Sequence, residues 1–208
     1  IALSLPAPCL AHGTDSFKQP LCEMGALYLA DALSNVHGGL REGSAWVDYL
    51  ELAAGFDAGR ALGIGDLKLF TSVVRTNPPT FSDRYVGDAM VVSNIDSERA
   101  LRVLEAWFDW GFEARGTGSV LVGLYDLNSE FDTTESRGLF LNSAYGIGQE
   151  LAQTGHNGPS IFPVTALAAR LAWAPAEPWL LEFAVVDGVP GDPDDHHTSR
   201  WHLSRSEG

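Results

Sequence analysis

The chain has 208 residues, of which 45% are hydrophobic and 19% charged, which suits one domain and is too apolar for intrinsic disorder. Its 27 acidic residues outnumber 13 Lys and Arg, and this excess argues against nucleic acid as a partner, since phosphate binding calls for a basic face. A transmembrane helix is excluded because no apolar run reaches about eighteen residues, but alternating strands of a membrane barrel are not.

The first segment, residues 1–24, is predicted to be a signal-peptide remnant or an unstructured N-terminal stretch, and residues 25–208 to form the folded part. Residues 1–11 are apolar and contain proline, as at the end of a secretory signal. Cys9 and Cys22 are too few for a disulfide framework and lack the spacing of a zinc site, so neither is given a function.

Alternation of apolar and polar residues predicts a series of β-strands. In the strand at 100–110, Leu104 and Phe108 are expected on one face and Val103 and Glu105 on the other. A helix is the alternative there, because the apolar residues also fit helical spacing. The predicted strands are 25–35, 44–56, 67–74, 100–110, 119–126, 164–173 and 181–185.

Two connections between these strands are far too long for hairpin turns. Residues 80–98 form the first, in which Val91 and Val92 are expected to make a short strand or a lining element. Residues 127–162 form the second, which is rich in Gly, Asn and Ser. Because loops of this length usually have a role, the second connection is a candidate functional element.

Three of the predicted strands have one apolar face and one face with a charged residue at mid-strand. These charged residues are Glu105, Arg170 and Glu182. A soluble β-sandwich alternates in this way with its polar face in water, and a membrane barrel does so with its polar face in the lumen. Alternation alone does not separate the two.

Longer sequence blocks do separate them. The blocks GLYDLNSEF, GLFLNSAYGIGQEL, GHNGPSIFPVTAL and VVDGVPGDPDD follow one another in order, after VGDAMVVSNID and LRVLEAWFDW upstream. In these blocks the chain resembles the carbohydrate-selective porin family (OprB type) of Gram-negative outer membranes. The resemblance covers residues 25–208 and corresponds to the N-terminal half of a full-length member.

The resemblance implies an all-β fold, an antiparallel transmembrane β-barrel of the porin type with long constricting loops. The chain supplies about seven or eight of about sixteen strands, an incomplete barrel. The implied function is passive, substrate-selective diffusion of mono- or small oligosaccharides across the outer membrane. The partners are then sugars, outer-membrane lipid and, at full length, a homotrimer. Neither enzymatic activity nor a cofactor or metal is expected.

The resemblance also points to residues of a pore constriction. Glu105 and Trp107 match the family's Glu-x-Trp, whereas a salt-bridge network that only rigidifies the barrel is the plainer interpretation of the charged positions. Leu121 stands where the family tends to place a polar inward residue, so the lining is expected to be less polar here. The candidates on the wall are Glu105, Trp107, Arg170, Glu182, Arg84 and Asp126, and those on the loop are Asn128, Glu130, Asn142 and Tyr145.

Two other function classes stay open on the residues alone. A soluble, lectin-like β-sandwich would bind sugar without transporting it. A glycoside hydrolase would use paired carboxylates, for which Glu105 with Asp109, or Glu130 with Asp132 and Glu135, are candidates. The acidic and histidine-bearing run at 192–197 is interpreted as a polar turn rather than a metal site.

Overall fold

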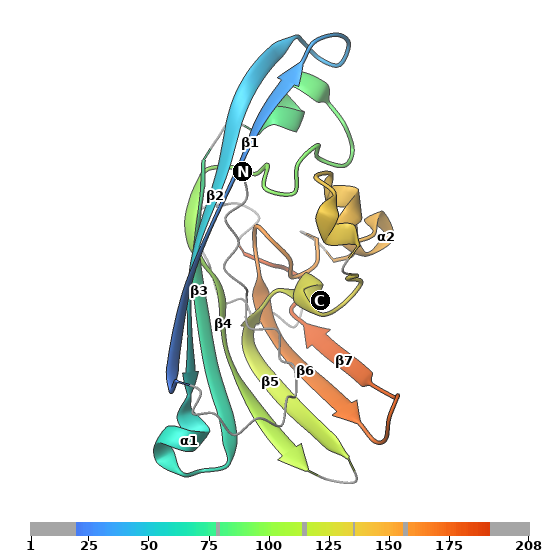
Figure 1. Ribbon diagram of the computed structural model, residues 1–208. Coiled ribbons are helices and arrows are strands. Elements are labelled where there is room, and N and C mark those ends of the chain that lie inside the picture. Colours follow the sequence, from blue (N-terminus) through green and yellow to red (C-terminus); the bar gives the residue numbers. More distant parts are fainter. Residues whose placement is uncertain (1–19, 78–79, 114–115, 135, 156–157, 192–208) are drawn as a thin grey trace.

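The described part of the chain folds into one antiparallel sheet whose seven strands follow one another in chain order (Figure 1). The computed structural model describes residues 20–77, 80–113, 116–134, 136–155 and 158–191. The sheet is curved, and the long connections lie on its concave side. The strands are β1 (Cys22–Asn35), β2 (Gly43–Asp57), β3 (Asp66–Asn77), β4 (Ala100–Glu113), β5 (Thr117–Tyr125), β6 (Ala166–Ala174) and β7 (Leu181–Val186).

The two long connections, β3–β4 and β5–β6, lie at the same end of the sheet as the short β1–β2 turn, and the β2–β3, β4–β5 and β6–β7 connections lie at the other end. The β2–β3 connection holds α1 (Ala58–Leu62), which Asp57 caps and which ends at Gly63 in the left-handed conformation. The long β3–β4 connection contains η1 (Ser82–Val86). The β5–β6 connection contains η2 (Leu127–Ser129), η3 (Arg137–Leu139), η4 (Ser143–Tyr145) and α2 (Gln149–Ala152).

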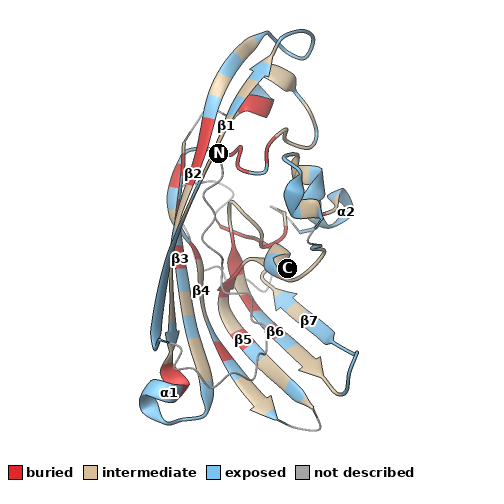
Figure 2. Ribbon diagram, in the orientation of Figure 1, coloured by how far each residue is buried: buried red, intermediate tan, exposed pale blue. Residues whose placement is uncertain are grey.

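The main apolar core lies between the concave face and these long connections, not within the sheet itself. Val47, Val74 and Leu104 point inward from β2, β3 and β4, and they pack with Phe81 and Ile95 of the β3–β4 connection. Figure 2 shows the buried residues where connections meet strands. Burial of these side chains therefore holds the connections against the sheet.

A β-bulge in β4 corrects the predicted faces of that strand. Val103 pairs with Val73 and Glu105 pairs with Ser72, so Leu104 is left without a partner in β3. The extra residue reverses the alternation: Leu104 is buried on the inner face, whereas Val103 is 37% exposed on the outer face. The strand itself is confirmed, and the helix alternative is wrong.

The predicted fold class is confirmed: the described residues form an antiparallel, all-β sheet in which β1 and β7 do not pair with each other. Val91 and Val92 do not form a strand. Among the described residues, no helix is both long and apolar enough to cross a membrane. β1 begins at Cys22, slightly before the predicted start of the folded part. The segment 1–19 and the turn at 192–197 lie outside the described residues.

Candidate functional site

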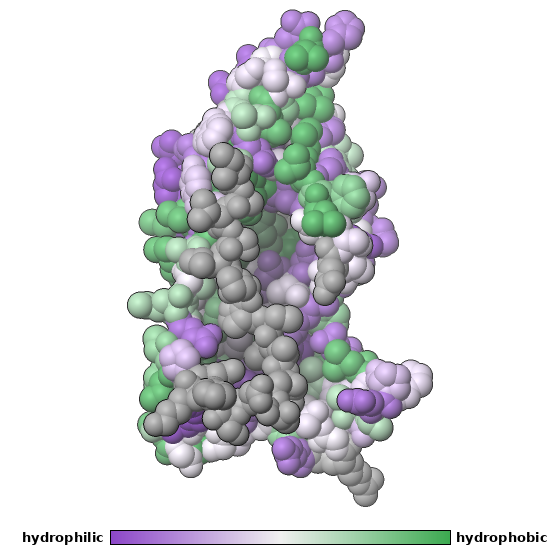
Figure 3. Space-filling model, viewed as in Figure 1, coloured by the Kyte–Doolittle hydropathy of each residue, from purple (hydrophilic) through white to green (hydrophobic). Residues whose placement is uncertain are grey.

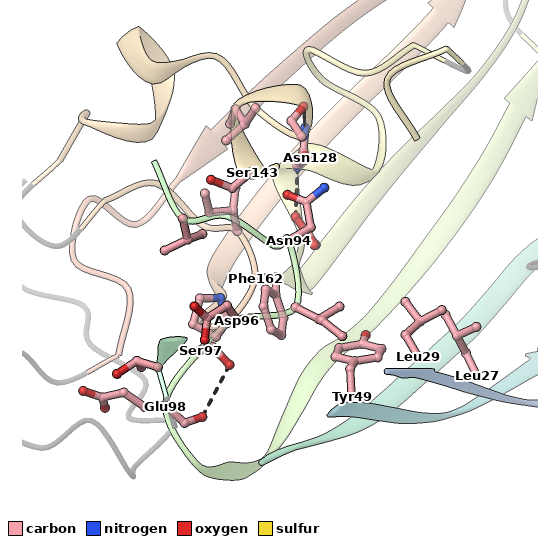
Figure 4. Close-up of a pocket in the computed structure, with 18 of the residues that line it drawn as sticks. Leu27, Leu29, Tyr49, Asn94, Asp96, Ser97, Glu98, Asn128, Ser143 and Phe162 are labelled. Carbon is pink, nitrogen blue, oxygen red and sulfur yellow. Dashed lines mark hydrogen bonds between the residues drawn. The ribbon is translucent and has the colours of Figure 1, made fainter. Parts of the chain in front are cut away.

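Two adjoining cavities lie between the inner face and the long connections. The first, of about 530 Å³, extends from Leu27 and Tyr49 on the strands to Phe162 on the β5–β6 connection (Figure 4). The second, of about 680 Å³, has a more polar set of lining residues. Both cavities are lined by Asn94, Asn128 and Gly146, so they lie side by side. The remaining residues of the second cavity are Thr133, Thr134, Arg137, Gly138 and Tyr145.

The two long connections are hydrogen-bonded to each other across this space. The Asn94 amide donates to the Leu141 carbonyl at 2.7 Å, and the Ser143 amide donates to the Val91 carbonyl at 3.1 Å. The Ser93 hydroxyl donates to Asp31 of β1 at 2.6 Å, which ties the first connection to the wall. Val91 also lines the first cavity, which agrees with the prediction that residues 91 and 92 form a lining element rather than a strand.

Three of the predicted wall residues form one contact group. The Trp107 indole donates to Glu105 Oε1 at 3.2 Å, and the Asp126 amide donates to the same oxygen at 3.3 Å. The Trp107 ring stacks on Phe70 of β3, with 5.0 Å between ring centroids. Across β5 the ring faces Gly123, where a Cβ would collide with Trp107 and with the neighbouring backbone. The Glu-x-Trp pair therefore presents a fixed carboxylate and a fixed ring on the inner face.

Asp126 links this group to the β5–β6 connection. Its Oδ1 caps η2 by accepting from the Asn128 amide at 2.9 Å. Burial, together with the nearby carboxylate of Glu51, raises the pKa of Asp126 to about 6, against backbone hydrogen bonds that lower it. Asp132, further along the connection, has its pKa lowered by the Gly148 amide and by Arg137.

Arg170 and Glu130 form a second, separate network. The Arg170 Nε and Nη2 donate to the two Glu130 oxygens at 2.7 and 2.9 Å, a bidentate pair. Nη1 donates to Ser119 at 2.6 Å and lies 3.7 Å from Asp109. The Tyr125 hydroxyl also donates to Glu130. The Arg170 side chain is only 2% exposed, so the arrangement anchors the loop to β5 and β6.

The other predicted residues are more scattered. Glu182 is exposed on β7, and Arg84 lies beside Tyr85 near the β1–β2 turn, away from Glu105. Asn142 caps η4, and Tyr145 stacks on Phe140 with 4.2 Å between ring centroids. The Asn128 side chain donates to the Phe131 and Gly146 carbonyls and shapes the space between the cavities. Sugar contact by these residues stays a prediction.

Sequence reasoning missed three residues of the site. The Tyr49 hydroxyl donates to Glu51 at 2.7 Å on the inner face, and Tyr49 lines the first cavity. Alternation groups these two residues on one face of β2, but it does not say which face is inward. Asn94 lines both cavities, and no local signal distinguishes it from other polar loop residues.

Three of the carboxylates proposed for a glycosidase lie beside arginine side chains, and Glu105 accepts hydrogen bonds from Trp107 and the Asp126 amide. Glu130 binds Arg170, Asp132 binds Arg137 at 2.8 Å, and Asp109 lies beside Arg170. Glu135 lies outside the described residues. Within the described ranges, no group of His, Cys, Asp and Glu side chains is arranged to hold a metal ion.

Comparisons with known proteins agree with this geometry. The family model for the carbohydrate-selective porin, OprB family, matches residues 38–208. The high-pH structure of Pseudomonas putida OprB superimposes with a TM-score of 0.67 at 16% sequence identity, covering 80% of this chain and 41% of that one. This chain therefore spans less than half the length of that structure. No curated protein sequence matches the chain. Because the family model covers most of the chain, the chain belongs to the OprB family of carbohydrate-selective porins.

Proposed function

We propose that the full-length protein lets mono- or small oligosaccharides diffuse passively across the outer membrane of a Gram-negative bacterium. This chain then supplies one wall of the pore together with its constricting loops. The observation that carries the proposal is the pair of adjoining cavities between the inner face and two infolded connections, in a chain of a porin family. Contact with outer-membrane lipid and assembly into a homotrimer belong to the same proposal.

The lining has the chemistry that sugar recognition needs. Asn94 offers its side-chain amide, and Asn128 offers its Oδ1, because the Asn128 NH2 group already donates to Phe131 and Gly146. These groups can replace water bound to sugar hydroxyls. Tyr145, which lines the second cavity and is 44% exposed, offers a ring face for the apolar face of a pyranose. Trp107 lies on the same inner face of the sheet, outside the residues that line the two cavities. Binding has to be weak, because a tightly held sugar would block its own passage.

Within this proposal the predicted residues take different roles. Glu105, Trp107 and Asp126 are the proposed constriction residues of the wall, and the Glu105 carboxylate holds them together by accepting from the Trp107 indole and the Asp126 amide. Glu130 and Arg170 keep the loop in place rather than contact sugar, because they already bind each other. Direct contact by Arg170 would require that pair to open.

Liposome swelling tests the function directly. Full-length protein reconstituted into liposomes should admit glucose and a disaccharide faster than protein-free liposomes, with no chemical change in the sugar. Ion conductance without sugar entry would refute the proposal. Release of reducing sugar from an oligosaccharide would favour the hydrolase.

The 208 residues alone are expected to behave differently. The β1 and β7 edges are not paired with each other, and hydrocarbon cannot satisfy exposed backbone groups. We therefore expect no stable unitary current steps when this chain alone is added to a planar bilayer. Such steps would show that these residues close a pore by themselves, for example as several copies.

A further inference from the structure

The outer face of β2, β3 and β4 carries a polar cluster in otherwise apolar surroundings. Leu52, Val73, Leu101 and Val103 point outward and are 55%, 37%, 73% and 37% exposed. At the left edge of Figure 3, where the rim of the sheet is visible, groups of apolar side chains alternate with hydrophilic ones. Into this face project four polar side chains, which we call the outer polar cluster: Asp48, Arg75, Asn77 and Arg99.

We propose that Arg75 and Arg99 of this cluster form a binding site for the phosphate of an anionic membrane lipid. Asp48 pairs with Asn77 across β2 and β3, and Arg75 pairs with Leu101 across β3 and β4, which places Arg75 and Asp48 on the outer face. The site requires that the strands cross a membrane, but not that the pore conducts sugar.

The contacts within the cluster leave cationic groups available. The side-chain Nδ2 of Asn77 donates to Asp48 Oδ2 at 3.0 Å, whereas Arg75 Nη1 donates to Asp48 Oδ1 at the longer distance of 3.4 Å. Arg99 Nη2 reaches Asn77 Oδ1 at 3.5 Å. Arg75 thus contacts the Asp48 carboxylate and Arg99 contacts Asn77, so the four side chains of the cluster carry two positive charges and one negative charge. The Arg75 side chain is 52% exposed, and Arg99 is exposed.

Asp48 holds the donors in place rather than neutralising them. It is only 6% exposed, because Arg75 and Asn77 cover it. The guanidinium groups lie further out, where a planar fork of N–H donors matches the oxygens of a phosphate.

The position of the cluster favours a lipid headgroup. β3 ends at Asn77 and β4 begins at Ala100, so the cluster lies at the end of these strands that carries the long connections. An outward charge costs most at the middle of a membrane and little at its interface, where lipid phosphates lie. On the other side of the sheet, Val74 and Thr76 are 1% exposed under the connections, so the cluster does not open into the cavities.

Native mass spectrometry of the full-length protein tests this site, with phosphatidylglycerol as the phosphate-bearing probe and diacylglycerol as the uncharged one. The double variant Arg75→Gln/Arg99→Gln should retain about tenfold less phosphatidylglycerol, with diacylglycerol binding unchanged. The matched control Arg41→Gln/Arg60→Gln removes the same charge from the β1–β2 turn and α1, and should retain wild-type binding. Inorganic phosphate alone should not displace the lipid, because it lacks the chains that contact the apolar surroundings.

Three outcomes would overturn the proposal. The first is an equal loss in the control and the double variant, and the second is no loss in either. The third is a change in the number of associated copies with lipid binding unchanged, which would identify a second copy as the occupant. Sugar entry into liposomes should be unchanged in the double variant, which verifies its folding. If that variant does not fold, Arg99→Gln alone should give a partial loss, and wild-type lipid binding in that variant would refute the site.

Discussion

The ion pair of Arg170 and Glu130 gives a sharp test of how the β5–β6 connection is held against the sheet. Glu130 is the only member of the network that comes from within the connection, whereas Arg170, Ser119 and Asp109 are on strands. Glu130→Gln keeps the shape of the side chain and removes its charge. The loop should then detach from β6 more often.

The size of the effect follows from burial. Removing one partner of a buried ion pair costs about 3–5 kcal/mol, because the remaining charge is left without compensation. The Arg170 side chain is 2% exposed, but Glu130 is 28% exposed and Asp109 still lies 3.7 Å from Arg170, so the lower end applies, about 3 kcal/mol. At 1.4 kcal/mol per tenfold change, the detached loop should become roughly a hundredfold more populated.

Single-channel recording of the full-length protein measures this population as current fluctuation. Glu130→Gln should add frequent transitions between current levels that are rare in the wild type. Glu150→Gln, which removes a charge from exposed α2 on the same connection, is the matched control and should leave the trace quiet. Equal noise in both variants, or none in either, would refute the anchoring role.

Three further predictions concern the wall. Because the pKa of Asp126 is raised to about 6, its carboxylate should be charged above pH 6 and lose its charge as the pH falls toward 4. The preference of the full-length channel for cations, measured as a reversal potential, should fall over this range. The fall should be smaller in Asp126→Asn, which has no carboxylate to titrate. Trp107→Ala with Glu105→Ala should change glucose entry by at least severalfold in liposome swelling, and an unchanged rate would remove both from the constriction. Gly123→Ala should lower the midpoint of urea unfolding, by about 1–3 kcal/mol in stability, because φ is +148° and a Cβ would collide with Trp107; Gly55→Ala, which meets open space, is its control.

Much of the sheet follows from sequence because barrel strands alternate with a period of two. The strands around Arg170 and Glu182 were predicted close to their observed bounds, with Arg170 opposite the apolar face. Only the motif blocks, however, separate a porin wall from a soluble sandwich. Alternation records which residues share a face and contains nothing about what covers that face.

The contacts of the site were less predictable, because they join residues far apart in the chain. Glu105 and Trp107 were expected together, and their hydrogen bond agrees with that grouping. Arg170 was expected as a lining charge, yet it binds Glu130, which lies 40 residues earlier. Both residues were candidates, but only tertiary structure shows that each occupies the other.

The bulge at Leu104 shows how one extra residue divides β4 between two tasks. Leu104 points inward and joins the core that holds the connections. The next residues along the strand, Glu105 and Trp107, also present their side chains on the inner face. Without the extra residue, either Leu104 or Glu105 would have to point outward, since neighbouring residues in a regular strand face opposite sides. The cost of a bulge is an unpaired backbone group. Here Thr165, at the end of the long connection, donates to the Leu104 carbonyl. The irregularity in the strand is therefore also a docking point for the loop, which explains why the loop meets the wall directly beside Glu105.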